Sequence, residues 1–400
     1  MGPSTDRLIA SPKGWQPDWL TSEFSLALID ALGSDNMCFV GGAVRDSLLG
    51  ISATDVDIAT PHTPEAVQRL LGKASIKTIP TGLQHGTITA VYGGATCEIT
   101  TLRRDVATDG RRAVVEFTDS WQADALRRDF TINALYVTSN GMIYDPVKGL
   151  DDLRDKVVRF IGDAEKRIEE DALRILRFYR FTGLFASQID ENGHVACRKC
   201  REMLDGLSVE RTRDELLKIL RLTNLASSIT HMKEAGILNR IYGDGWLSAP
   251  IEVYCINETR LKAPIDPLVR LYVLSSDLLS AVEIAEKFKL SNLDRRFLLT
   301  LERACQHSHL ETEKDIRRSL YIYGKPATLA AAIVRSNTIY DTVSQVSHDW
   351  PIPEFPLKGR DLIALGATAG PELGETLTRL EENWIESDFS LTKDQLLATL

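Results

Sequence analysis

The chain has 400 residues, more than one ordinary hydrophobic core holds, so we expect two or more domains. Its hydrophobic content of 44% and charged content of 26% are average for folded proteins, which excludes a disordered or fibrous chain. The net charge of -9 argues against binding nucleic acid through overall positive charge, although a local basic strip can bind it within an acidic chain.

The composition predicts a cytoplasmic protein. No apolar run is long enough to span a bilayer, and the start lacks the basic-then-apolar order of a secretory signal. The six cysteines therefore indicate reduced thiols. Cys197, Cys200 and His194 are half of a possible metal site, but without a second Cys/His pair a plain helical segment is the simpler interpretation.

Helix and strand signals alternate in the first 145 residues. Thr63 before Pro64 is a good helix start, and Gly72 is expected just past the end of that helix. Gly93-Gly94 lies between two alternating segments, as in a β-hairpin. The other expected elements are a helix at 21–31 closed by Gly33, strands at 37–40 and 54–60, a helical turn at 44–50, and a turn and strand at 140–145.

After Asp145 the pattern is helical. Apolar residues recur with helical spacing at 171–181, 210–221 and 267–290, and few plausible strands remain. A break is expected near Leu222. The predicted domains are therefore a mixed α/β domain at 1–145 and helical regions at 146–222 and 223–400.

Asp55 and Asp57 give the first chemical signal. Residues two apart on a strand point to the same side, so both carboxylates can reach one point above a sheet. A divalent cation between them would relieve their repulsion, and Mg²⁺ is usually held by one or two carboxylates plus substrate phosphates. For this pair taken alone, a solvated face of an edge strand is the alternative.

Gly41-Gly42 and Arg45 come shortly before the two aspartates. Glycines let the backbone approach a ligand, and the turn into a helix presents amide groups and an arginine to phosphate. Packing alone explains many glycine pairs of this kind. A phosphate-binding turn followed by two carboxylates is, however, what transfer of a nucleotide from a metal-bound triphosphate requires.

These motifs resemble those of a known family. "GGAVRDSLLG", "TDVDIAT", "RRDFTINAL", "DPVKGLDDL", "EEDALRILRFYRF" and "SVERTRDEL" follow the order seen in class II tRNA nucleotidyltransferases and bacterial poly(A) polymerases of the polymerase-β superfamily. The resemblance extends through the last of these motifs. It implies an α+β fold: a nucleotidyltransferase head with a mixed β-sheet, followed by an all-helical neck that selects the base and a helical body and tail that bind tRNA.

The resemblance implies Mg²⁺-dependent nucleotidyl transfer. Asp55 and Asp57 would hold two Mg²⁺ ions, which activate the hydroxyl of the RNA primer and stabilise the leaving pyrophosphate. Glu98 is the candidate third acidic residue, and a rim glutamate paired with an arginine is the alternative for it. The other expected nucleotide-binding residues of the head are Gly41, Gly42, Arg45, Arg128 with its neighbour Arg127, and Asp129 and Asn133 near the sugar.

Asp171 and Arg174 are expected to select the base. On one helix, residues i and i+3 lie side by side, so Asp171 would accept from the amino group of cytosine or adenine while Arg174 donates to the adjacent ring nitrogen. Guanine and uracil present the donor and the acceptor in the opposite order, and each mismatched buried group costs about 1–3 kcal/mol. Without the resemblance, a plain salt bridge would be the simpler interpretation. Arg177 would help to set the nucleotide, and Arg211 and Glu215 would brace the selecting helix.

Two further segments favour CCA addition over A-tailing. "IKTIPTGLQHGTITAV" resembles the CCA-adding branch, and "RRDVATDGRRAVVEFTDSW" would be the intact flexible loop that accompanies addition of the final A. We therefore expect addition of C, C and A to tRNA from CTP and ATP, with the helical part holding the acceptor stem and elbow. A poly(A) polymerase, a CC-only enzyme and an A-only enzyme remain alternative functions. The intact aspartate pair disfavours a catalytically silent RNA-binding protein, and the base-selecting helix disfavours a transferase acting on small molecules.

Overall fold

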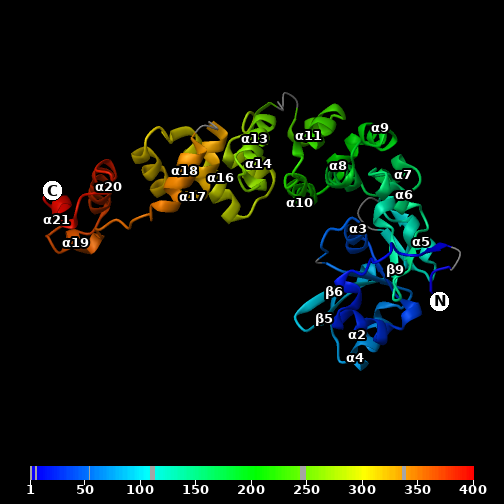
Figure 1. Ribbon diagram of the computed structural model, residues 1–400. Coiled ribbons are helices and arrows are strands. Elements are labelled where there is room, and N and C mark those ends of the chain that lie inside the picture. Colours follow the sequence, from blue (N-terminus) through cyan, green and yellow to red (C-terminus); the bar gives the residue numbers. More distant parts are fainter. Residues whose placement is uncertain (1, 5–6, 54, 109–112, 244–248, 336–338) are drawn as a thin grey trace. The chain divides into compact units, whose positions relative to one another are not determined.

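The computed structural model describes residues 2–4, 7–53, 55–108, 113–243, 249–335 and 339–400 (Figure 1). The chain divides into two compact units, residues 1–244 and 245–400. All strands of the described chain lie before residue 145, and helices make up the described remainder. The predicted α+β class, a mixed-sheet head followed by helices, is therefore confirmed. The domain boundaries at 145/146 and 222/223 stay predictions.

An eight-stranded sheet forms the centre of the head, in the order β1-β10-β9-β2-β3-β6-β5-β4. Strands β3 and β6 are parallel and the other neighbours are antiparallel, so the sheet is mixed as expected. The predicted hairpin is β5 and β6, joined by Gly93 and Gly94, which both have positive φ. The strands are β1 (Leu8–Ile9), β2 (Cys38–Val40), β3 (Asp57–Thr60), β4 (Lys77–Gly82), β5 (Thr87–Tyr92), β6 (Ala95–Thr101), β9 (Tyr136–Thr138) and β10 (Ile143–Tyr144).

The helix signals of the head are confirmed with one exception. Gly33, with φ of 87°, ends its helix, and the Thr63 hydroxyl accepts the Ala66 amide at 3.4 Å at the next helix start. Gly72 lies inside that helix rather than past its end, because burial of Val67 and Leu71 outweighs the weak preference against glycine. The head helices are α1 (Asp18–Thr21), α2 (Glu23–Leu32), α3 (Gly42–Leu48), α4 (Pro64–Lys73) and α5 (Trp121–Leu126).

Two further local predictions were wrong. The strand expected at 54–60 begins only at Asp57, so Asp55 precedes it. The segment expected as a flexible loop contains two antiparallel strands, β7 (Arg103–Thr108) and β8 (Ala113–Phe117). Its residues 109–112 lie outside the described part of the chain. Valines occur on both sides of the charged centre of this segment, and valine favours extended backbone; the prediction of a flexible loop gave weight to the charged residues only.

Aromatic packing attaches the following helices to the head. The Phe130 ring lies 4.9 Å from that of Phe160, 6.2 Å from that of Phe178 and 5.5 Å from that of Phe181, measured between ring centroids. The last two rings belong to α8, so this cluster fixes α8 against the sheet domain. The helices are α6 (Gly149–Arg154), α7 (Ala164–Glu170), α8 (Leu173–Phe185), α9 (Glu191–Lys199), α10 (Val209–Ile219), α11 (Leu225–Glu234) and α12 (Ile237–Tyr242).

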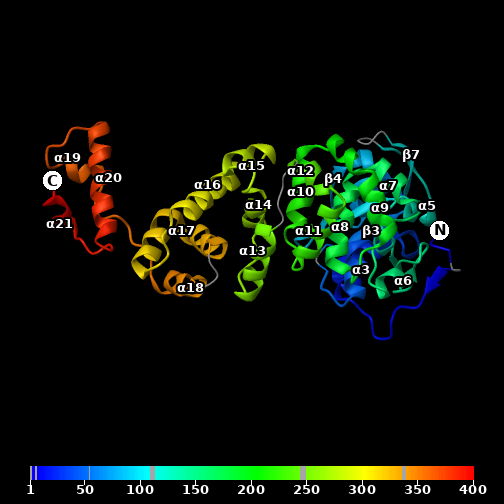
Figure 2. The same cartoon turned by 90° about the horizontal axis from the view of Figure 1, so that it is seen from above.

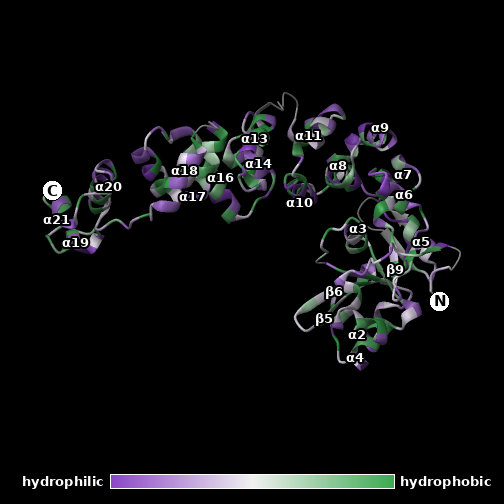
Figure 3. Ribbon diagram, in the orientation of Figure 1, coloured by the Kyte–Doolittle hydropathy of each residue, from purple (hydrophilic) through white to green (hydrophobic). Residues whose placement is uncertain are grey.

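The second unit is helical throughout its described residues, and Figure 2 shows it from a second direction. Its helices carry both hydrophobic and hydrophilic residues (Figure 3). None of the helices among the described residues combines the length and apolar character needed to cross a bilayer. They are α13 (Ala249–Arg260), α14 (Pro267–Ser275), α15 (Ala281–Lys287), α16 (Asn292–His307), α17 (Glu313–Arg335, kinked at Gly324), α18 (Tyr340–Asp349), α19 (Gly359–Ile363), α20 (Pro371–Glu386) and α21 (Lys393–Leu397).

A buried ion pair joins α13 to α14. The side chains of Glu258 and Arg270 are 2% and 1% exposed, and the Arg270 guanidinium donates to both carboxylate oxygens of Glu258, from Nε at 3.1 Å to Oε2. Breaking such a pair from one side leaves an uncompensated charge in the interior.

Arg270→Met is therefore expected to lower the free energy of unfolding by about 3–5 kcal/mol. The double variant Glu258→Met/Arg270→Met is expected to recover most of that loss, because neither charge then remains. Urea unfolding of both variants beside the parent measures the effect. A single variant as stable as the parent would contradict the assigned role of the pair.

Candidate active site

The glycine turn lies where β2 ends and α3 begins. Gly41 has φ of 79° and ψ of -132°, a conformation that residues with a side chain rarely adopt. A Cβ placed there would lie 3.9 Å from Nη1 of Arg128 and 4.0 Å from Oδ2 of Asp57. A Cβ at Gly42 would lie 3.6 Å from Nη2 of Arg45. The turn is thus bordered by one carboxylate and two guanidinium groups.

Asp57 lies beside this turn and interacts electrostatically with two further carboxylates, those of Glu98 and Asp55. Asp57 on β3 pairs in register with Glu98 on the parallel neighbour β6, and Asp55 lies two residues before Asp57. Burial, together with the charges of Glu98 and Asp55, raises the pKa of Asp57 to about 6, although Arg128 opposes the shift. Among the described residues Glu98 forms no ion pair with an arginine, which was the alternative considered for it. Burial is the main cause of the raised pKa and the neighbouring carboxylates add to it, so a bound cation would favour the charged form of Asp57.

The donor set fits Mg²⁺ only if a substrate completes the coordination. Within the described residues, no group of three or more His, Cys, Asp or Glu side chains is placed to hold a metal ion by itself. Mg²⁺ commonly takes one or two carboxylates and fills the remaining positions with water and substrate phosphates. Asp55 and Asp57 beside the glycine turn match that requirement.

Asp124 orients the arginine pair, and the sequence reasoning missed it. Its Oδ1 accepts from Nε of Arg127 at 2.8 Å, and its Oδ2 accepts from Nη2 of Arg128 at 3.1 Å and from the Tyr136 hydroxyl at 2.7 Å. Burial alone would raise its pKa, but Arg128 and Arg127 hold the pKa of Asp124 at about 2. The signal was its position three and four residues before the two arginines on a helical segment.

A chain of hydrogen bonds links α3 to α8. Arg45 donates from Nη1 to the Asn133 amide oxygen at 2.5 Å, and Asn133 donates from Nδ2 to Asp129 at 3.0 Å. Nε of Arg177 donates to the other Asp129 oxygen at 2.7 Å. Burial raises and Arg177 lowers the pKa of Asp129, with a net lowering. The structure therefore brings together four of the predicted nucleotide-binding residues, although their individual roles stay predictions.

The predicted base-selecting pair does not lie on one helix, so the i, i+3 argument was wrong. Asp171 has extended backbone between α7 and α8, and its Oδ1 accepts the Leu173 amide at 3.1 Å. Arg174 lies in the first turn of α8 and donates to Glu170 Oε2 at 2.6 Å and to the Arg127 carbonyl at 3.0 Å. Asp171 caps the start of the helix that carries Arg174. Aspartate side chains favour such capping positions, which explains why the helix breaks here.

The residues expected to brace this region do contact it. Nη2 of Arg211 on α10 donates to Oδ2 of Asp171 at 2.7 Å. Glu215, 2% exposed, pairs with Arg180 of α8. Helix α10 therefore holds both the α7–α8 junction and α8 itself.

His194 and Cys197 of the cysteine segment lie on α9, and within the part of the chain that the structure describes no group of three or more metal-binding side chains occurs. Cys197 is fully buried on α9, and burial raises the pKa of its thiol well above the usual value. His194 accepts or donates one hydrogen bond with the Tyr179 hydroxyl at 3.2 Å, and burial lowers its pKa. The helical interpretation of this segment is the better one.

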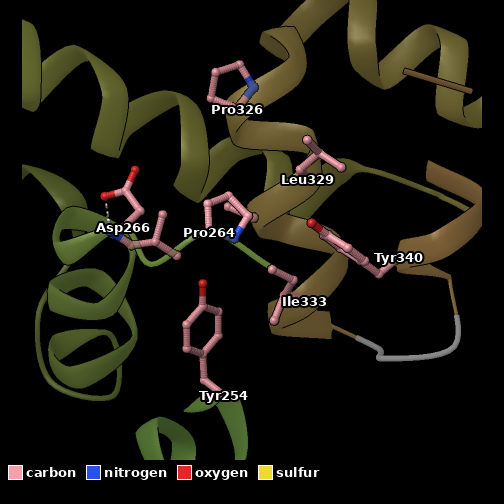
Figure 4. Close-up of a pocket in the computed structure, with 9 residues that line it drawn as sticks. Tyr254, Pro264, Asp266, Pro326, Leu329, Ile333 and Tyr340 are labelled. Carbon is pink, nitrogen blue, oxygen red and sulfur yellow. Dashed lines mark hydrogen bonds between the residues drawn. The ribbon is translucent and has the colours of Figure 1, made fainter. Parts of the chain in front are cut away.

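A cavity of about 120 Å³ lies among α13, α14, α17 and α18 (Figure 4). Tyr254, Ile333 and Tyr340 contribute to its mostly apolar lining. The one lining carboxylate, Asp266, accepts the Leu268 amide at 2.8 Å at the start of α14. The cavity is therefore a gap in packing rather than a second reactive site.

Two family models match the chain. The model described as Poly A polymerase head domain matches residues 37–159, which include the glycine turn and the three carboxylates. The model described as Probable RNA and SrmB- binding site of polymerase A matches residues 188–242. Fold and site together define a nucleotidyltransferase with a polymerase-type head.

Relatives span nearly the whole chain. The CCA tRNA nucleotidyltransferase 1, mitochondrial, of Danio rerio is 35% identical and covers 90% of this chain and 86% of its own length. The CCA-adding enzyme of Leuconostoc citreum (strain KM20) is 34% identical over 90% of each chain. The crystal structure of the Bacillus stearothermophilus CCA-adding enzyme in complex with CTP has a TM-score of 0.74 at 28% identity, covering 93% of this chain and 94% of that one. The chain belongs to the family of class II CCA-adding enzymes and poly(A) polymerases within the polymerase-β nucleotidyltransferase superfamily.

Gly41→Ala tests the glycine turn. The unfavourable backbone conformation is expected to lower the free energy of unfolding by about 1–3 kcal/mol and to weaken nucleotide binding. Gly72→Ala is the matched control, because open space surrounds that helical position and alanine there is expected to stabilise by about 0.5–1 kcal/mol. Thermal unfolding and nucleotide titration measure both, and a Gly41 variant indistinguishable from the parent would contradict the assignment.

Asp57→Asn tests whether the charged Asp57 carboxylate destabilises the fold when no metal is bound. Since the pKa of Asp57 is about 6 in the folded state and 3.8 ordinarily, the folded protein binds this proton more tightly than the unfolded chain does. Without metal, the charged carboxylate therefore destabilises the fold above about pH 6, and this effect disappears as pH falls towards 4. The variant is expected to melt at a higher temperature than the parent at neutral pH in EDTA, with the difference shrinking at pH near 5. Asp151→Asn, on the exposed α6 surface, is the control, and a difference independent of pH would refute the explanation.

Proposed function

We propose that this protein adds C, C and A to the 3′ end of tRNA without a nucleic-acid template, using CTP and ATP and releasing pyrophosphate. The observation that carries the proposal is the pair of relatives named for CCA addition, at 35% and 34% identity across 90% of the chain. The presence of CTP in the related crystal structure supports CTP as a substrate.

The carboxylates would hold Mg²⁺ at the start of β3, beside its neighbour β6. When bound, the ions lower the pKa of the attacking hydroxyl and neutralise charge on the departing pyrophosphate. Asp57 lies next to both other acidic residues, Asp55 along the chain and Glu98 across the strand pair, so it is the central ligand in this proposal. The raised pKa of Asp57, caused mainly by burial and also by Glu98 and Asp55, supports this assignment, since a divalent cation would stabilise the charged carboxylate.

Arg128 and Arg45 would hold the triphosphate. Their guanidinium groups border the two glycines of the turn, where phosphate oxygens can approach the backbone. Asp124 fixes Arg128, and Asn133 fixes Arg45. Both cations are held in place before the nucleotide arrives, so little conformational entropy is lost on binding.

Asp171 and Arg174 would select the base at the α7–α8 junction. The Asp171 side chain is 31% exposed, and each of its carboxylate oxygens can accept a second hydrogen bond while Arg211 and Leu173 hold the first. The described residues take up three of the five N–H donors of Arg174, two from Nη1 and one from Nη2. Asp171 can therefore still accept, and Arg174 can still donate, a hydrogen bond at the edge of cytosine or adenine.

We propose tRNA as the partner of the helical region. The helices from residue 223 onward would hold the acceptor stem and elbow of tRNA by shape and phosphate contacts. A cytoplasmic location stays a prediction, because the relatives include proteins named as mitochondrial.

Incorporation into defined RNA ends tests the proposal. Purified protein and Mg²⁺ are incubated with tRNA ending before the first C, after C or after CC, and with oligo(A), each with single nucleoside triphosphates. We expect C on the first two tRNAs and A on the third. Failure to add A to CC-ended tRNA would favour a CC-adding enzyme, and preferential extension of oligo(A) would favour a poly(A) polymerase.

Two substitutions separate chemistry from selection. Asp55→Ala is expected to abolish every addition, because a metal ligand is lost. Arg174→Ala is expected to raise misincorporation of UTP and GTP about tenfold or more relative to CTP and ATP, since one discriminating hydrogen bond disappears. Arg154→Ala on the exposed surface of α6 is the control. Unchanged misincorporation by the Arg174 variant would remove the selecting role.

A further inference from the structure

Arg45 is a buried cation with few charged partners. Its residue is 7% exposed, and its hydrogen bonds run to the Asp46 carboxylate, at 2.8 Å from Nε, and to the neutral Asn133 amide, at 2.5 Å from Nη1. Burial lowers the pKa of Arg45, and the charge of Asp46 opposes that change. These bonds lie in the guanidinium plane, so the two planar faces need a different kind of contact.

Aromatic rings of α8 supply that contact. The Arg45 Cζ lies 4.3 Å from the centroid of the Phe185 ring and 5.1 Å from that of Phe181. A guanidinium group at this distance from an aromatic ring is attracted by the negative face of the ring, most strongly where water is excluded. Two residues at the end of α8 thus border the phosphate-binding end of α3.

The two rings differ in what else they hold. Phe181 is 5% exposed and also lies 4.2 Å from Cζ of Arg180 and 5.1 Å from Cζ of Arg177. Phe185 is half-buried in the last turn of α8, and among the described arginines only Arg45 lies over its ring. Its ring also stacks on that of Phe181, with centroids 6.0 Å apart and an interplanar angle of 20°. Phe185 therefore acts on one cation, whereas Phe181 belongs to a larger cluster.

We propose that Phe185 is a positioning residue for the triphosphate, because its ring fixes the plane of the Arg45 guanidinium beside the glycine turn. Asp46 and Asn133 hold the guanidinium nitrogens from within the plane, and the Phe185 ring supports a face of the group; without that ring, Phe181 at 5.1 Å is the remaining aromatic contact of Arg45 among the described residues. The inference rests on the proposed nucleotidyl transfer, in which Arg45 holds phosphate.

The position of Phe185 predicts which kinetic constants it affects. Arg174 begins α8 and would contact the base, whereas Phe185 ends α8 and acts through a phosphate-binding arginine. The effect of Phe185 is therefore the same for CTP and ATP and leaves base choice unchanged. This pattern separates it from residues that read the base.

Substitution of the ring gives the first test. Phe185→Leu keeps an apolar side chain but removes the π face, and we expect the KM for both CTP and ATP to rise about threefold to tenfold with kcat nearly unchanged. Phe185→Trp is expected to restore the parent KM, because tryptophan binds cations most strongly of the aromatic residues. Phe24→Leu is the matched control, since Phe24 is a half-buried phenylalanine that stacks on Tyr92 at 5.7 Å.

Fluorinated phenylalanine at position 185 gives a test that packing alone cannot pass. One, two, three and five ring fluorines progressively weaken the negative face at nearly constant shape. KM for each nucleotide, and the inhibition constant of pyrophosphate as a probe without a base, are expected to rise stepwise with fluorine number. Melting temperatures of the same proteins show whether the fold is retained.

The outcomes are distinct. Stepwise increases shared by CTP, ATP and pyrophosphate support the inference. Equal constants across the fluorinated series, or a Leu variant that matches the parent, overturn it while leaving nucleotidyl transfer intact. A parent protein that incorporates no nucleotide into tRNA or oligo(A) overturns the proposed function itself, and with it this role of Phe185.

Discussion

The charge of Asp57, partly buried at the start of β3 close to two other carboxylates, is the constraint that the rest of the site must accommodate. The parallel pairing puts Asp57 beside Glu98, above the fully buried Ile58 and Ile99 that anchor the two strands. The result is a raised pKa for Asp57, which only Arg128 partly offsets. In the proposed function, a divalent cation and a triphosphate would together offset this unfavourable charge.

The positive side of the site is held as firmly as the negative side. Asp124, Asn133 and Asp129 each accept a hydrogen bond from an arginine, and none of the three residues is more than 8% exposed. Buried networks in which every member has a partner restrict side chains to one arrangement. The cations therefore keep their positions around the glycine turn without a ligand.

In the proposed function, helix α8 would connect recognition of the base with recognition of the phosphates. Its first turn carries Arg174, its middle carries Arg177 against Asp129, and its end carries the rings over Arg45. The aromatic cluster around Phe130 fixes the helix to the sheet domain. One rigid element thus sets the distance between the two ends of the nucleotide that it would bind.

The fold class, the family and most element positions could be predicted from the amino-acid sequence, because they follow from local spacing and motif order. Period-two and helical patterns, the Thr63 cap and the Gly93-Gly94 turn depend on residues close in the chain, and the order of motifs identified the polymerase-type head. Gly41, Arg45, Asp55 and Asp57 were predicted as site residues in the same way, since they lie within one short segment, and their roles stay predictions.

The contacts between groups far apart in the chain became known from the folded structure. The register of β3 with β6 joined Glu98 to Asp57, and the fold brought Asp124 to Tyr136 and Arg177 to Asp129. It also broke the expected helix at Asp171, where capping of α8 and the bond to Arg211 outweigh helical spacing. Such contacts depend on strand pairing and packing between segments far apart in the chain, which spacing along one sequence does not encode.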